Sequence, residues 1–172
     1  MKTLLKWLGI SIAALILALA LFFFGMRFHD GPWDMITGGP FTTGESSAPP
    51  ADWSFLKEDK LTEFQTLTPQ TSRTVWLGVH QGRLFLVSGY MNSTMGKIWK
   101  QWPHYMAEDN RIILRHGGKL YELQLQRQME GDHLQGVLDE FGRKYGLAGT
   151  TELIRNQDVW LYEALPRQNP GR

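Results

Sequence analysis

The chain has 172 residues, a formal net charge of +1 at pH 7 and no cysteine. Residues 1–30 carry Lys2, Lys6, Arg27 and Asp30, a net charge of +2, so residues 31–172 sum to −1. This near-neutral charge gives no electrostatic basis for nucleic-acid binding, and the lack of cysteine excludes disulfides.

An uncharged run of twenty residues extends from Trp7 to Met26 and reads WLGISIAALILALALFFFGM. At 1.5 Å per residue, a helix of this length spans roughly 30 Å, the thickness of the hydrocarbon core of a bilayer. A helix that is apolar on all sides is typical of a membrane span rather than of a soluble core. We therefore predict that residues 1–30 form a membrane anchor, which contacts the bilayer through residues 7–26.

The anchor is expected to stay uncleaved. Residues 18–20 form a small-x-small site, but residues 21–24 continue the apolar run beyond it, which a signal peptide would not do. Lys2 and Lys6 precede the run and Arg27 follows it. This bias places the N-terminus in the cytoplasm. We predict a single-pass protein of the inner (cytoplasmic) membrane, with its domain on the periplasmic or extracellular side.

Residues 31–60 are predicted to be a Gly/Pro-rich linker and lead-in. Residues 31–52 hold four glycines and four prolines, which excludes a regular element. Residues 42–51 have the composition of a tether, whereas Trp33, Met35, Ile36 and Phe41 are too apolar for one. Two interpretations of these apolar residues stay open, a position at the membrane interface and packing over the domain.

Residues 61–166 carry the signals of a mainly β domain. One hairpin joins residues 73–79 to 83–88 through His80-Gln81-Gly82, and a second joins 111–116 to 119–126 through Gly117-Gly118. Residues 64–67 and 158–164 are predicted as a leading and a closing strand. Hairpins with few helices favour a small barrel over a parallel sheet. Residues 167–172 are expected to be a disordered tail.

Two helices are predicted in the same domain. Between Asp132 and Gly146 the apolar residues recur at helical spacing and end at a glycine, as in an amphipathic helix with a glycine cap. The second helix is expected to begin near Lys97 and to carry Trp99 and Trp102. Pro103 is predicted to end or kink it.

The segment from Ser88 to Lys97 contains the groups that a phosphate requires. Ser88 ends a strand, Thr94 and its neighbours offer hydroxyl and amide donors, Gly96 allows close approach of the backbone, and Lys97 supplies a cation at a helix start. The GxxxxGK[ST] phosphate loop is absent. A polar turn that only caps a helix has the same composition, so both interpretations stand.

Together these motifs resemble the FMN-binding split-barrel superfamily, which includes pyridoxamine-phosphate oxidases and deazaflavin-dependent nitroreductases. Arg73 lies where that family has a basic residue at the start of a strand, Ser88 where it has a Ser or Thr at a strand end, and Lys97 at its helix start. Asn110-Arg111 stands where the family has Asn-Pro before the next hairpin. The resemblance covers residues 64–165.

The resemblance implies a homodimer of six-stranded barrels with FMN or a deazaflavin at the interface between them. Its phosphate would lie on Arg73, Ser88 and Lys97, with Thr94 in the same loop, and Trp99 or Tyr121 would line the ring site. We therefore expect a membrane-anchored oxidoreductase, in which the cofactor supplies the chemistry and the protein orients it. The alternative is a barrel without a cofactor that acts as a binding or scaffold domain at the membrane surface.

No catalytic residue and no metal site stand out in the sequence. None of the five histidines lies four residues from another, and there is no cysteine to complete a zinc site. Trp76, Trp99, Trp102 and Trp160 are expected in the core or in a dimer interface, because each lies within an apolar element.

Overall fold

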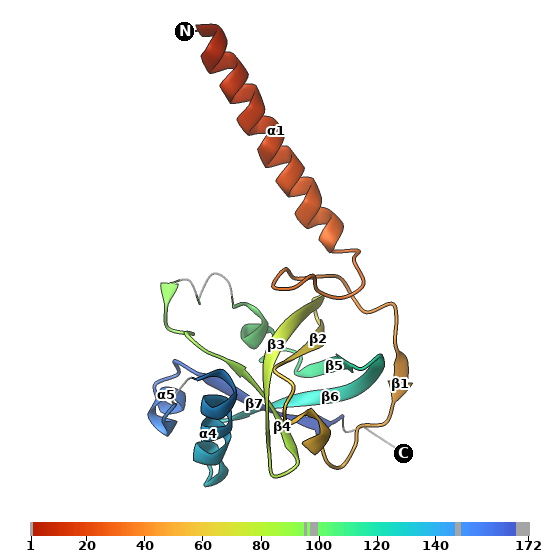
Figure 1. Cartoon of the computed structure of the whole chain (residues 1–172), viewed down its shortest axis with the longest axis vertical. Coiled ribbons are helices and arrows are strands. Elements are labelled where there is room, and N and C mark those ends of the chain that lie inside the picture. Colours follow the sequence, from red (N-terminus) through yellow and green to blue (C-terminus); the bar gives the residue numbers. More distant parts are fainter. Residues whose placement is uncertain (1, 95, 97–99, 147–148, 168–172) are drawn as a thin grey trace.

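The computed structural model describes residues 2–94, 96, 100–146 and 149–167. Its N-terminal helix α1 (Lys2–Met26) projects away from a small β domain (Figure 1). This helix is long and apolar enough to cross a membrane, and its residues 2–25 are exposed. The predicted apolar span is therefore a continuous helix whose contacts with the rest of the chain lie at its C-terminal end, at Phe22 and Met26.

Six antiparallel strands form a closed barrel. They are β2 (Leu61–Leu67), β3 (Gln70–His80), β4 (Arg83–Ser88), β5 (Arg111–His116), β6 (Lys119–Gln128) and β7 (Trp160–Pro166). The order around the barrel is β6-β5-β2-β3-β4-β7, and pairing of β6 with β7 closes it. The prediction of a mainly β, six-stranded barrel behind one apolar helix is confirmed.

The turns fix the register of both predicted hairpins. His80 pairs with Arg83 across Gln81 and Gly82, whose φ angles are 53° and 75°. His116 pairs with Lys119 across Gly117 and Gly118, whose φ angles are 56° and 75°. Two successive positive φ angles match the twist of the flanking strands, which is why two-residue turns of this kind join them.

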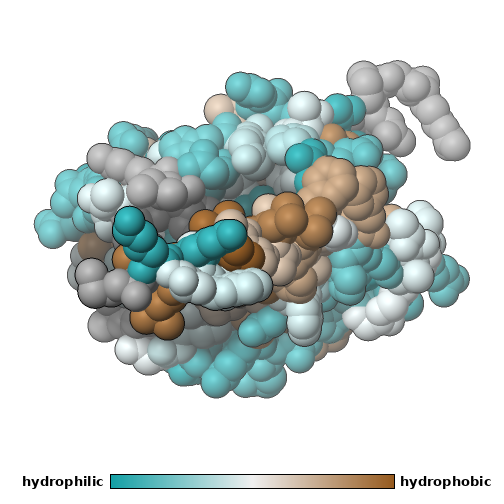
Figure 2. All heavy atoms as spheres, turned by 90° about the horizontal axis from the view of Figure 1, so that it is seen from above, coloured by the Kyte–Doolittle hydropathy of each residue, from teal (hydrophilic) through white to brown (hydrophobic). Residues whose placement is uncertain are grey.

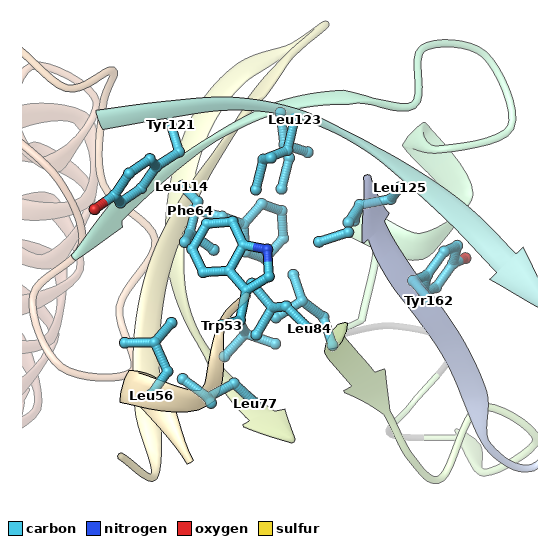
Figure 3. Close-up of a cluster of buried hydrophobic side chains, with 14 of the residues drawn as sticks. Trp53, Leu56, Phe64, Leu77, Leu84, Leu114, Tyr121, Leu123, Leu125 and Tyr162 are labelled. Carbon is cyan, nitrogen blue, oxygen red and sulfur yellow. The ribbon is translucent and has the colours of Figure 1, made fainter. Parts of the chain in front are cut away.

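Alternate residues of each strand fill the barrel. The side chains of Phe64, Leu77, Leu114 and Leu123 are fully buried in one cluster (Figure 3). Trp53, just before the 3₁₀ helix η1 (Ser54–Leu56), joins this cluster from one end of the barrel. The interior is thus a packed core rather than a ligand cavity.

Helix α4 (His133–Tyr145) covers the outside of the barrel with the predicted apolar stripe, and it ends at Gly146 with a φ of 70°. Its stripe forms a second cluster with Phe85 and Leu161. Gly78 allows this contact, because a Cβ there would lie 2.7 Å from the ring of Phe141. The helix predicted from periodicity is confirmed.

Several elements differ from the prediction. Strand β1 (Glu45–Ser47) lies in the predicted linker and pairs in parallel with β6, and helix α5 (Thr151–Arg155) has no predicted counterpart. Pro103 lies in the first turn of α3 (Trp102–Tyr105), so it begins a helix rather than ending one. Arg167, expected in the tail, pairs with Glu122 at 3.0 Å.

Residues 27–44, here called the strap, lie on the outer face of the barrel. Gly38 and Ser72 exchange both backbone hydrogen bonds, each 3.0 Å long. The amide of Phe41 donates to the side-chain oxygen of Gln65 at 2.6 Å, and the hydroxyl of Thr74 donates to the carbonyl of Asp34 at 2.8 Å. The strap therefore packs over the domain through its backbone and the partly buried Ile36 and Phe41, whereas Trp33 and Met35 stay exposed, so a position at the membrane interface stays open for these two.

Arg115 of β5 joins the strap to the barrel electrostatically. Its guanidinium lies 2.9 Å from Asp30 and 2.7 Å from Glu63, and it covers the ring of Phe41 at 4.2 Å. Burial raises the pKa of Asp30, but hydrogen bonds from Thr43 and its neighbour and the charge of Arg115 outweigh it. The pKa of this carboxyl therefore lies well below its ordinary value.

Candidate functional site

Arg73 points into one end of the barrel. On β3 it follows the same alternation as Val75, Leu77 and Val79, which are all buried in the core cluster. Its backbone pairs with Phe64 of β2. Its terminal nitrogen donates to the hydroxyl of Thr71 at 3.2 Å.

A second arginine reaches the same end from β6. Arg127 continues the inward series of Tyr121, Leu123 and Leu125, and its backbone pairs with Tyr162 of β7. Its guanidinium carbon lies 3.7 Å from the ring centroid of Trp160. The sequence reasoning missed Arg127, although extending the apolar alternation of β6 by one step would have indicated an inward cation.

Ser88 lies at the same end as the last residue of β4. It follows Leu84 and Leu86 on the inward face, pairs with Trp160 and is 2% exposed. Its hydroxyl donates to the sulfur of Met91 at 3.2 Å. Because a thioether is a weak acceptor, this hydroxyl can donate to a stronger one.

The other predicted site residues do not join this group. Thr94 is exposed, while Lys97 and Trp99 lie outside the described residues. Tyr121 lies six residues before Arg127 on one strand, roughly 20 Å away at 3.3 Å per residue. Its ring packs on Trp53 at 5.2 Å, on the opposite side of the core from Tyr162 (Figure 3).

Helix α3 covers the arginine end of the barrel. Trp102 is buried and lies 5.1 Å from Phe64 and 5.2 Å from Tyr162, between ring centroids. The hydroxyl of Tyr162 donates to the carbonyl of Pro103 at 3.2 Å. Pro103 therefore starts a helix whose aromatic residue closes the barrel, and this shields the arginines from bulk water.

Both inward arginines have buried nitrogens without an acceptor. Within the described ranges, Nε of Arg73 and both Nε and Nη2 of Arg127 lack a hydrogen-bond partner. Burial lowers the pKa of Arg73 to about 10, against a smaller opposing effect of Tyr105, so Arg73 is charged at neutral pH. Buried donors of this kind are normally paired with an acceptor. Their lack of an acceptor here indicates an anion-binding site.

Two carboxylates that shortly precede β5 and β7 are engaged in other contacts. Asp109 forms an ion pair with Arg111 at 2.8 Å. Asp158 accepts a hydrogen bond from Asn92 at 2.7 Å. The inward arginine end therefore keeps its positive charge, and an oxyanion with several acceptor atoms matches its free donors.

A second titratable cluster lies outside the barrel, under α4. Arg83 forms a two-point ion pair with the buried Glu163. The pKa of His133 is lowered, mainly by burial, and the charges of Arg83 and Glu163 also act on it. Across residues 2–94, 96, 100–146 and 149–167, no three His, Asp or Glu side chains could hold a metal ion together. We therefore treat this cluster as structural.

Comparison with known proteins gives only distant likenesses. No family model matches the chain, and no curated protein matches its sequence. Among solved structures, a conserved hypothetical protein from Mycobacterium tuberculosis is 15% identical with a TM-score of 0.46, over 67% of this chain and 78% of that one.

Two further structures are similar to the chain. A "Putative Pyridoxamine 5'-phosphate oxidase" from Listeria innocua is 10% identical with a TM-score of 0.44, over 67% of this chain and 90% of that one. The heme storage protein HutZ from Vibrio cholerae is 12% identical with a TM-score of 0.43, over 67% and 87%. The first of these belongs to the kind of protein that the sequence resembles. Such distant likeness carries no argument about function, which rests on the geometry above.

Proposed function

We propose that the chain is a membrane-anchored, split-barrel protein that binds FMN or a deazaflavin and acts as an oxidoreductase. The observation that carries the proposal is the pair of inward arginines, Arg73 and Arg127, with three buried nitrogens that lack an acceptor. A phosphate supplies what these donors lack, because its oxygens accept several charge-assisted hydrogen bonds at once.

In this proposal Arg73, Arg127 and Ser88 hold the phosphate. The hydroxyl of Ser88 would exchange its sulfur acceptor for a phosphate oxygen. Thr94 and Lys97 follow Ser88 along the chain and stay part of the proposal on the strength of the sequence resemblance. Burying two unpaired cations is unfavourable, and a dianion offsets this cost.

The ring of the cofactor would lie against aromatic residues at the same end. We favour Trp160 over Tyr121, because Trp160 flanks Arg127 at 3.7 Å whereas Tyr121 packs on Trp53 in the core. Trp99 stays a candidate from the sequence alone. A flavin or deazaflavin would supply hydride or electron transfer when bound. The residues of the chain would bind it, orient it and keep water away.

The proposal includes a homodimer and a membrane location. Split barrels of the kind that the sequence resembles place the cofactor between two barrels, so a second copy would complete the ring site. Helix α1 would anchor each copy in the inner membrane. Lys2 and Lys6 would lie on the cytoplasmic side, with the barrel on the periplasmic or extracellular side.

The test compares FMN with riboflavin, which lacks the phosphate, by fluorescence titration of the full chain in detergent micelles. The wild type should bind FMN saturably and riboflavin more weakly. Arg73→Met should weaken FMN binding about tenfold or more, the value of one charge-assisted hydrogen bond, and leave riboflavin binding unchanged. Arg155→Met, on the exposed surface of α5, is the matched control and should change neither affinity.

A variant that weakens both ligands equally would show a general loss of structure and would count against the phosphate site. If the wild type binds neither FMN nor a deazaflavin, the alternative gains support, a cofactor-free binding or scaffold domain at the membrane. One observation favours that alternative. The barrel interior is filled by side chains such as Phe64 and Leu123, so it offers no internal ligand cavity.

A further inference from the structure

Three exposed apolar side chains lie where α1 meets the strap. Phe28, Trp33 and Met35, here called the apolar rim, are 74%, 57% and 76% exposed. Figure 2 looks down on the side of the molecule from which α1 projects. It shows apolar residues in brown along the helix, in front of a mainly hydrophilic surface in teal and white. Isolated exposed apolar residues are ordinary, but three around one helix end call for a physical reason.

The ring of Trp33 folds back onto the apolar helix. Its centroid lies 5.8 Å from that of Phe22, and Phe22 is four residues before the end of α1. At 1.5 Å per residue, the contact lies about 6 Å inside the last residue of the helix. Whatever surrounds Phe22 therefore also surrounds the ring of Trp33.

The rim is also fixed to the barrel. Trp33 and Ile36 exchange two backbone hydrogen bonds of 3.0 and 2.9 Å, which close the turn that carries Met35. The hydroxyl of Thr74 on β3 holds the carbonyl of Asp34 in the same turn at 2.8 Å. The rim thus has a set position relative to both the apolar helix and the β domain.

We infer that the apolar rim binds the lipid bilayer at its interface and, together with α1, holds the barrel in one orientation against the membrane. The inference rests on the proposed membrane anchoring. The occupant is lipid rather than protein, because Trp33 touches a residue of the span itself. Tryptophan and phenylalanine beside a membrane span favour the headgroup region.

The polar neighbours set the depth of this contact. Arg27 and Asp34 are exposed within the same surface, so Phe28 and Met35 lie at the level of the headgroups, while the ring of Trp33 extends below them to the level of Phe22. Arg27 suits anionic headgroups, to which a nearby basic side chain is attracted. Residues 28–36 therefore fix the orientation of the barrel relative to the membrane. A flexible tether would instead let the barrel rotate freely above it.

The lack of native cysteine allows a direct test with single nitroxide labels on the full chain. The labels are placed at Phe28→Cys, Met35→Cys, Ile16→Cys and Phe55→Cys, and each protein is reconstituted in vesicles of phosphatidylcholine and phosphatidylglycerol. Ile16 reports on the span. Phe55, in η1 on the far side of the barrel from α1 (Figure 1), is the matched control because it is 57% exposed, as Trp33 is.

Collision rates with oxygen, which concentrates in lipid, and with a water-soluble nickel chelate give the depth of each label. We expect the Phe28 and Met35 labels to collide with the chelate several-fold less than the Phe55 label, at a depth between those of Phe55 and Ile16. Chelate access at Phe28 and Met35 equal to that at Phe55, with Ile16 protected, would overturn the inference and leave the anchor intact. An accessible Ile16 label would instead refute the anchoring itself.

Discussion

We predict that Arg73 destabilises the folded protein when no ligand is bound. Its buried charge has no anionic partner among the described residues, and removing an uncompensated buried cation favours the folded state. We expect Arg73→Met to raise the free energy of unfolding by about 1 kcal/mol in the absence of ligand. The measurement is thermal unfolding of the full chain in detergent, followed by the near-ultraviolet signal of its tryptophans.

A control variant and the effect of FMN test this prediction further. Arg155→Met should change stability by less than about 0.5 kcal/mol, because that side chain is exposed on α5. FMN should raise the melting temperature of the wild type more than that of Arg73→Met, because the variant binds it more weakly. A loss of about 2 kcal/mol or more in Arg73→Met would mean that the arginine supports the fold instead of a ligand.

Lys144 differs from Arg73, because it is a buried cation whose hydrogen bonds are all made within the fold. Its ammonium donates to the carbonyls of Asp59 at 2.6 Å, Leu77 at 3.1 Å and Leu56 at 3.4 Å. These bonds tie α4 to β3 and to η1. Lys144→Met fills a similar volume but removes all three bonds. The carbonyls of Leu77 and Leu56 keep a second donor in Tyr145 and in the amide of Asp59, so we expect a loss of about 1–2 kcal/mol in the free energy of unfolding. Chemical denaturation of the two proteins in detergent measures it.

Lys119→Met provides the comparison for Lys144, since Lys119 is exposed at the start of β6. It should leave stability within about 0.5 kcal/mol of the wild type. Equal effects of the two substitutions would show that the hydrogen bonds of Lys144 contribute nothing beyond its aliphatic packing.

At the scale of elements, the strap should detach from the barrel in acid. The folded pKa of Asp30 is lowered, so its contribution to stability is complete above the ordinary carboxyl pKa of about 3.9 and declines as the pH falls toward the folded value. Asp30→Asn removes that contribution at any pH. The melting temperature of Asp30→Asn should therefore lie below that of the wild type above about pH 5, and the gap should narrow below about pH 4.

Melting curves of both proteins between pH 3 and pH 7 test this prediction. The exposed Glu130→Gln should match the wild type throughout. A gap between Asp30→Asn and the wild type that stays constant down to pH 3 would mean that the carboxylate charge is not what binds the strap to Arg115.

The sequence predicted those elements whose signal is local. The hairpins at Gln81-Gly82 and Gly117-Gly118 and the stripe of α4 follow from turn preference and periodicity, and all three are confirmed. Strand β1 has three residues and α5 has five, too short for a periodic pattern. Both form because neighbouring elements already offer partners, which a single segment does not reveal.

Of the candidate site, the sequence located the inward arginine end only in part. Arg73 and Ser88 were identified from a family pattern, and the structure brings them to one end of the barrel. Tyr121 was assigned to the same site, yet barrel geometry separates it from that end. Arg127 lies one residue beyond the predicted strand of residues 119–126, whereas β6 extends to Gln128. Which end of a barrel an inward residue occupies depends on register, and that is set by pairing between distant segments.

At the scale of the whole molecule, the fixed junction between α1 and the barrel limits how two copies can associate. Both helices would enter the bilayer from the same side. A twofold axis lying in the membrane plane would point one helix into water, so the axis of a symmetric pair must run along the membrane normal. The shared interface is then a lateral face of the barrel, and neither the rim nor the opposite pole near Phe55 can belong to it. Copies that meet by diffusion in the bilayer would arrive already aligned about that axis.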